Sequence, residues 1–234
     1  MRFVTHSLLL IAVAGCLTLA ARADVFWRLP KTAGTRLSAL GGSRMYATDV
    51  QVNGAPGTLA AFAFDTSTSQ VSASLARRLK LPQQGVAAPG TAAMLTHAEN
   101  GRLERYFVLP SPTLGGGCVV LAFDQSLRDA AKTGQAAIAW PAGIPAFAAE
   151  PLFTAVCAKT RATFVTAEAA SSPEAAMQDA AQALRGAGWD EVPPSMPTFK
   201  IFVSGRKQSV LFANHGAHSE RATISLLQRE GATP

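Results

Sequence analysis

The sequence predicts an α+β fold built as two tandem pseudo-repeats, each an antiparallel sheet with one helix packed on a face in a two-layer arrangement. Three observations support this. Short apolar stretches are joined by hairpin signals, of which Asn53-Gly54 is the strongest. Each half contains an amphipathic stretch that opens with a helix-capping serine, Ser67 or Ser172. The elements follow in the same order in both halves, although residue identity between the halves is low.

The first half begins with a predicted hairpin. Residues 45–52 alternate in polarity, and residues 58–64 form an apolar return strand after the Asn-Gly turn. A helix is expected next, because Ser67 and Gln70 match the capping-box pattern. Its predicted apolar face consists of Val71, Leu75 and Leu79. Further strands are expected at 91–97, 102–109 and 118–124.

The second half has the same plan. Residues 153–168 read as strand material, and Ser172 followed by Pro173 predicts the start of a helix. The apolar stripe of this helix consists of Met177, Ala181 and Leu184. A loop is expected at 189–197, followed by a hairpin at 198–213 and a last strand at 221–228.

The expected domain organisation has five parts. They are a signal peptide (1–23), an extended N-terminal lead (24–43), α+β repeat 1 (44–128), an Ala/Pro/Gly-rich linker (129–152) and α+β repeat 2 (153–231).

The N-terminus predicts export across a bacterial membrane. Arg2 precedes an apolar run at 7–20, and an Ala-Arg-Ala site ends at Ala23 before Asp24. This indicates a periplasmic or secreted protein. An alternative is a lipoprotein anchored at Cys16, since Val13 to Cys16 resembles a lipoprotein box. That anchor is the only membrane contact expected.

Charge and composition limit the partners. The 234-residue chain carries a net charge of +6 and is 48% hydrophobic, enough to build a core. Removing residues 1–23 takes away two arginines, which leaves 19 basic and 15 acidic residues, or +4. The basic residues are scattered without interleaved aromatics, so nucleic acid is not an expected partner.

Two cysteines remain after the predicted cleavage, Cys118 and Cys157. In an oxidising compartment this even count favours one disulfide between them. The alternative is two buried free thiols that pack as small apolar side chains.

The segment from Val50 to Leu81 resembles the first half of a retropepsin-like aspartic protease. An Asn-Gly hairpin and an apolar strand lead to Asp65-Thr66, and a segment ending in Leu81 follows. The resemblance implies Asp65 as a catalytic candidate, one of two carboxylates that share a proton. The chain departs from the family pattern at Ser67, where the family has glycine. In the second half the nearest acid at the equivalent strand end is Glu168.

A second chemical candidate is the pair His215 and His218, with Glu220 close by. Two imidazoles and a carboxylate are suitable zinc ligands, but the spacing falls in a glycine-containing loop where a polar turn is the alternative.

The tryptophans Trp27, Trp140 and Trp189 all fall in connecting regions. They are candidates for aromatic anchors at a protein interface, or else pack onto the core.

The favoured function is that of an exported, non-catalytic accessory protein. It would bind another envelope protein, for example in a secretion or pilus-type assembly, through an open sheet edge. No cofactor is expected. The alternatives are a hydrolase, either a degenerate protease at Asp65 or a metal enzyme at His215 and His218, and a small-ligand-binding module.

Overall fold

A computed structural model describes residues 31–81, 91–111, 115–133, 138–215 and 221–231. The predicted signal peptide, Cys16, Trp27, His218 and Glu220 lie outside these ranges. The fold is α+β, and all strand pairs described below are antiparallel. The chain divides into two compact units. Unit 1 includes the described residues up to Val50 and Ala55–Lys132, and unit 2 includes Gln51–Gly54 and the described residues from Thr133.

Unit 1 is a sheet with the strand order β3-β4-β5-β2-β1. In chain order its elements are α2 (Lys31–Ser38), β1 (Ser43–Val52), β2 (Ala55–Phe64), α3 (Thr68–Arg78), β3 (Ala93–Glu99), β4 (Arg102–Pro110), β5 (Cys118–Ser126) and α4 (Leu127–Thr133). The predicted Asn53-Gly54 turn forms, and a second Asn-Gly turn forms at Asn100-Gly101. Asn53 and Gly54 have φ of 49° and 82°, and Asn100 and Gly101 have φ of 52° and 74°. Positive φ at both central residues is the requirement of a type I′ hairpin.

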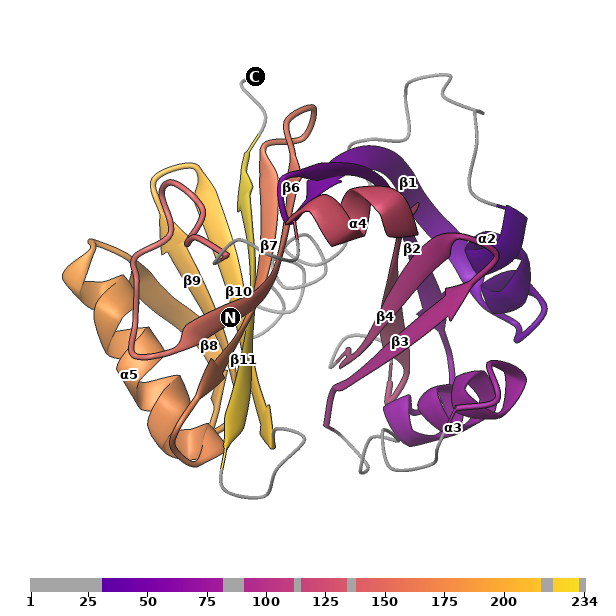
Figure 1. The fold of residues 1–234 in the computed structure, drawn as a ribbon. Coiled ribbons are helices and arrows are strands. Elements are labelled where there is room, and N and C mark those ends of the chain that lie inside the picture. The colour runs from indigo at the N-terminus through magenta and orange to yellow at the C-terminus, as the bar shows by residue number, and fades with distance from the viewer. Residues whose placement is uncertain (1–30, 82–90, 112–114, 134–137, 216–220, 232–234) are drawn as a thin grey trace. The chain divides into compact units, whose positions relative to one another are not determined.

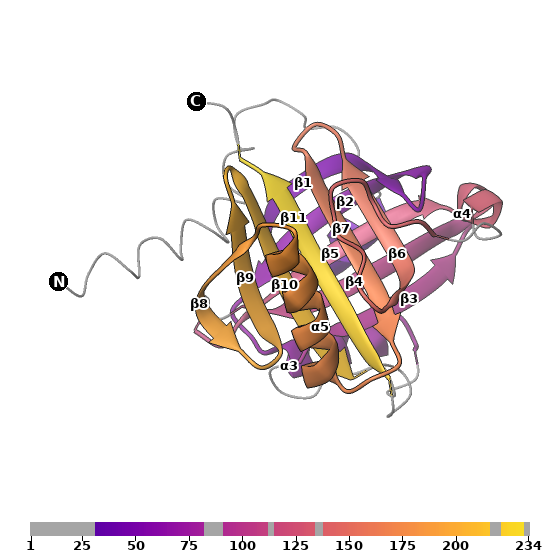
Figure 2. The same cartoon turned by 90° about the vertical axis from the view of Figure 1, so that its left-hand side faces the viewer.

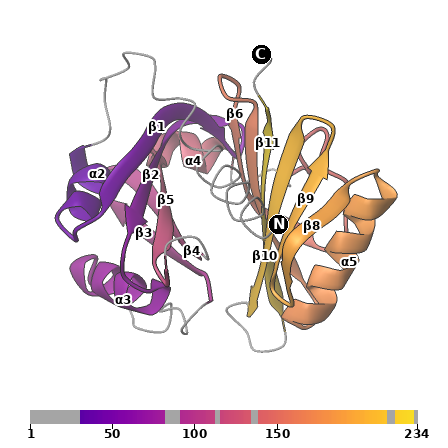
Figure 3. The same cartoon turned by 180° about the vertical axis from the view of Figure 1, so that it is seen from behind.

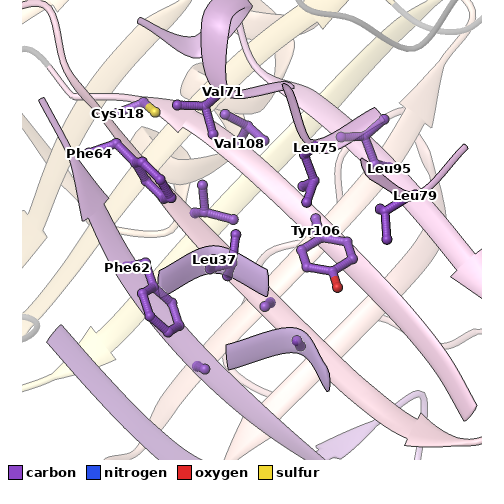
Figure 4. Packing of buried hydrophobic residues seen from close by; sticks show 14 of the residues in the cluster. Leu37, Phe62, Phe64, Val71, Leu75, Leu79, Leu95, Tyr106, Val108 and Cys118 are labelled. Atoms are coloured by element: carbon purple, nitrogen blue, oxygen red, sulfur yellow. The ribbon is translucent and has the colours of Figure 1, made fainter. Parts of the chain in front are cut away.

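Helices α2 and α3 cover the same face of the unit 1 sheet (Figures 1 and 3). Leu37 of α2 and Leu75 of α3 enter one apolar cluster with Phe62 of β2 and Tyr106 of β4 (Figure 4). The prediction of an extended lead is therefore wrong for residues 31–38, which form α2. Burial of Ala33 and Leu37 on the sheet explains why this stretch is helical despite its weak sequence signal.

The capping box predicted at the start of α3 is present. The Ser67 hydroxyl accepts a hydrogen bond from the Gln70 N–H, and the Gln70 side chain accepts from the Ser67 N–H. Two backbone donors that a helix start leaves free are thereby satisfied.

The tip of the first hairpin, Gln51–Gly54, belongs to unit 2. Gln51 pairs with Val156 and Val52 with Ala155. The Thr154 N–H donates to the Asn53 side-chain oxygen at 2.7 Å.

Unit 2 is a sheet with the strand order β6-β7-β11-β10-β9-β8. Its elements are β6 (Glu150–Cys157), β7 (Ala162–Ala169), α5 (Pro173–Gly186), β8 (Asp190–Met196), β9 (Phe199–Ser204), β10 (Lys207–His215) and β11 (Ala222–Glu230). Helix α5 lies across β10 and β11 on one face (Figure 2). Ser172 caps α5 as predicted, accepting from the Ala175 N–H.

Strand β8 and helix α4 were not expected from the sequence. Residues 190–196 were predicted as loop, but they pair with β9, interrupted by a register shift between Val192 and Met196. The predicted linker likewise starts inside α4, and β6 begins before the linker was expected to end.

Candidate protein-binding edge

Asp65 lies at a strand-to-helix junction. It follows β2, is exposed, and makes no hydrogen bond or ion pair with the described part of the chain. The two positions after it lead into the α3 cap, where Ser67 replaces the glycine of the protease pattern. A proton-sharing pair needs a second carboxylate within hydrogen-bond reach. The described residues supply none to Asp65, so the geometry does not support catalysis there.

The histidine pair is only partly placed. His215 is the last residue of β10, exposed and paired in register with Ala222. Its proposed co-ligands lie outside the described residues. Within the described ranges, no group of three or more His, Cys, Asp and Glu side chains is arranged to hold a metal ion.

The predicted Cys118–Cys157 disulfide is absent from the structure, in which both cysteines are free and buried. Cys118 faces the core cluster of unit 1 beside Val71 and Val108 (Figure 4). Burial raises the pKa of the Cys118 thiol to about 11. Such a thiol behaves as a small apolar side chain and not as a nucleophile.

Two of the three tryptophans pack on the core of unit 2. Trp189 is only 5% exposed and belongs to the cluster beneath α5, so it offers no free ring to a partner. Trp140 is partly buried on the same cluster and stacks at a tilt against Phe147, with ring centroids 4.5 Å apart.

A network of charged side chains lies on the helix-covered face of unit 1. Arg36 of α2 donates to Glu104 of β4 at 2.5 Å and to Glu99 of β3 at 2.7 Å. The Tyr106 hydroxyl donates to the same Glu104 oxygen at 2.6 Å. Glu104 is only 3% exposed. Arg36 therefore ties α2 to the two strands nearest the β3 edge of the sheet.

Asp124 of β5 stands directly opposite Glu104 in the β4–β5 ladder. It is 1% exposed, and one of its oxygens accepts from Arg102 at 2.6 Å. Its other oxygen has no hydrogen-bond partner in the described structure. Burial raises the Asp124 pKa, the Arg102 hydrogen bond opposes that shift, and the Glu104 charge adds to it.

This network is suited to holding α2 in place and not to chemistry on a substrate. Both carboxylates are closed off from solvent, whereas a general acid or base must reach the proton that it transfers. Sequence reasoning missed the network. A usable signal was present in the sequence. Arg102 and Glu104 are two residues apart in a predicted strand and therefore lie on the same face, and Asp124 is a charged residue at the end of an otherwise apolar predicted strand.

Strand β3 is the terminal strand of the unit 1 order. The hairpin at Asn100-Gly101 makes Glu99 and Arg102 its closing hydrogen-bonded pair. In an antiparallel ladder such pairs alternate along the strand. The odd-numbered residues of β3 thus bond to β4, and the backbone groups of Met94, Thr96 and Ala98 point away from it.

Within the described residues, the outward side of β3 is open. The side chains of Met94, Thr96 and Ala98 are all exposed, and Met94 is 43% exposed although it is a large apolar residue. No strand of the described chain pairs with this side. The seven residues of β3 contain no proline and no bulge in their register with β4. A strand with these features is a ready template for another strand.

Strand β8, the terminal strand of unit 2, is protected in contrast. Pro193 and Pro194 lie within its register shift, and proline removes the N–H that an added strand would need. Glu191 of β8 also accepts from Lys200 at 2.5 Å and is ion-paired with Arg185 of α5. Between β1 and β6 the register pairs only Gln51 with Val156 and Val52 with Ala155.

The chain matches no family model, no curated protein and no solved structure. None of the helices described here has the length and hydropathy of a membrane span. In the part of the chain that the structure describes, the fold is antiparallel α+β, and of the two strands that end the strand order β3 is open and β8 is protected.

Proposed function

We propose that this chain is an exported, non-catalytic protein that works by binding another protein in the bacterial envelope. Its role would be that of an accessory subunit of a larger assembly, such as a secretion or pilus-type machine. The observation that carries the proposal is the open edge of β3. Main-chain hydrogen bonds to an added strand give affinity, and pockets for alternate side chains give specificity.

The state of the acidic side chains in the described residues supports a binding role. Asp65 is exposed, with no second carboxylate beside it among these residues, and the buried acids Glu104 and Asp124 are held by Arg36 and Arg102. The best-organised charged groups therefore stabilise the unit that presents β3.

We also infer that the two units are tandem repeats of one two-layer plan. In each unit a hairpin is followed by a serine-capped helix, a second hairpin and a last strand. The order β3-β4-β5-β2-β1 corresponds to β9-β10-β11-β7-β6, element for element. Strand β8 is an addition to the second unit at the position where the first unit leaves β3 open.

Export is proposed from the sequence alone. The apolar run at 7–20 and the Ala-Arg-Ala site support cleavage after Ala23. An envelope location places the β3 edge among extracytoplasmic partners.

The test is a pull-down that depends on the β3 backbone. Tagged full-length protein is expressed with its signal, cross-linked in cells and recovered as wild type, Thr96→Pro or Thr96→Val. Thr96→Pro removes an outward N–H and leaves the β3–β4 ladder intact, since edge strands tolerate proline at such positions. Thr96→Val keeps the N–H and serves as the matched control.

The proposal expects one envelope protein recovered with wild type and Thr96→Val and lost with Thr96→Pro. Recovery of nothing specific by wild type, or equal recovery by Thr96→Pro, would defeat it. Circular dichroism and thermal melting establish that each variant is folded. If Thr96→Pro does not fold, Ala98→Pro removes a second outward N–H and replaces it in the comparison.

A further inference from the structure

We propose that, when no other strand occupies it, β3 pairs antiparallel with β3 of a second copy of this chain, about a two-fold axis at Thr96. The inference rests on the proposed function, because it names a first partner for the same edge. Three features carry it: the positions of the outward backbone groups, the side chains that would face one another, and the protection of β8.

The outward backbone groups are symmetric about Thr96. Residues 94, 96 and 98 point away from β4, and Thr96 is the middle residue of the seven-residue strand. In a two-fold antiparallel pair, Thr96 faces Thr96 of the second copy and each Met94 faces Ala98. Each of these pairs is then a hydrogen-bonded pair, in which both residues exchange N–H and C=O groups. This register uses every outward group of β3.

The side chains also fit this register. Met94, exposed when the chain is alone, is covered beside the small Ala98 of the second copy. The central pair is threonine with threonine, one of the favourable cross-strand pairs. On the helix-covered face, Glu99 lies opposite Ala93 and His97 opposite Leu95. No two like charges meet, and the two Glu99 side chains stand at opposite ends of the paired strands.

Pairing through β3 ends at two copies. An isologous two-fold contact closes on itself. Growth through the other terminal strand is blocked by Pro193 and Pro194 in β8. A single pair of seven-residue strands is a small interface, so we expect dimerisation to depend on concentration. A partner strand competes for the same groups and releases the second copy.

The test introduces a positive or a negative charge at position 96 and measures self-association by sedimentation velocity over a wide concentration range. Thr96→Lys and Thr96→Glu each place two like charges opposite one another at the axis. Either change is expected to weaken self-association about fivefold or more. An equimolar mixture of the two places opposite charges there and recovers the association. Thr96→Val, which adds no charge, serves as the control and dimerises like wild type.

A wild-type protein that stays monomeric at every concentration overturns this inference and leaves the proposed function to the pull-down. A dimer unaffected by either charge overturns it too, because the contact then lies elsewhere. If both charged variants lose the dimer and mixing does not restore it, β3 pairs in a different register or with a different partner. That result also overturns the inference. Recovery on mixing is specific to Thr96 facing its own copy. If self-association follows this pattern but the pull-down finds no envelope partner, the dimer stands and the accessory role fails.

Discussion

Glu104 and Asp124 stand directly opposite each other on β4 and β5, both almost fully buried, and each is held by its own arginine. Arg36 reaches Glu104 from α2, and Arg102 reaches Asp124 from within β4. Two buried acids side by side are tolerated only if their charges are compensated. The network thus links the position of α2 to the part of the sheet that ends in β3.

Replacing Glu104 with glutamine should loosen α2. Arg36 would lose its least exposed carboxylate partner and Tyr106 its charged acceptor. Hydrogen bonds to charged groups contribute about 1.5–3 kcal/mol, so we expect a loss of that order in unfolding free energy. Glu99→Gln is the matched control, because Glu99 is 50% exposed and should change stability little. Urea unfolding measures both, and equal effects would contradict the account.

Glu191 should give the protein acid sensitivity. Partial burial raises its pKa, but hydrogen bonds from Lys200, Ser195 and Arg185 outweigh this and lower the pKa to about 2. A carboxyl with a lowered folded pKa stabilises above its unfolded pKa, and the stabilisation is lost as pH falls through the folded value. As the pH falls from about 4.5 to 2, the unfolding free energy of the wild type should therefore decrease more than that of Glu191→Gln. The expected difference is roughly 1 kcal/mol, because solvent screens the interaction. Parallel pH profiles of the two proteins would refute this.

The N-terminal caps of α3 and α5 should make similar contributions to the unfolding free energy. Ser67 and Ser172 each accept a hydrogen bond from the N–H three residues later. Changing either to alanine should cost about 1 kcal/mol of unfolding free energy, whereas aspartate at the same position should be nearly neutral. Thermal or urea unfolding of the four variants checks this. An alanine variant as stable as its aspartate counterpart would show that the cap contributes nothing.

The cysteines should behave as two protected thiols. With the Cys118 pKa raised to about 11, labelling of the native protein at neutral pH should be slow. After denaturation without reductant, both Cys118 and Cys157 of the exported protein should label. Mass spectrometry counts the added groups. A denatured protein that takes up label only after reduction would establish a disulfide instead.

Local signals in the sequence were enough to predict the hairpins and the two capped helices. Asn53-Gly54 and the Ser67–Gln70 box act over a few residues and form as expected. Helix α2 could not be predicted in the same way, because burial of Leu37 on the sheet stabilises it. β8 contains two prolines that argue against a strand, and it forms only because β9 offers an edge.

The candidate edge was anticipated only in general form. Open sheet edges follow from any small antiparallel sheet, but choosing β3 over β8 needs the strand order, which depends on long-range pairing. The Arg36–Glu104 contact joins residues 68 positions apart and was likewise beyond local pattern.

Residue-resolved amide hydrogen exchange tests the central claim, that the outward side of β3 is the binding edge. In dilute protein the amides of Met94, Thr96 and Ala98 should exchange fast, while those of Leu95 and His97 are protected by β4. Raising the concentration or adding the partner should protect the first three and leave the others unchanged. Slow exchange at Met94, Thr96 and Ala98 in the dilute monomer, or no change on association, would contradict the account.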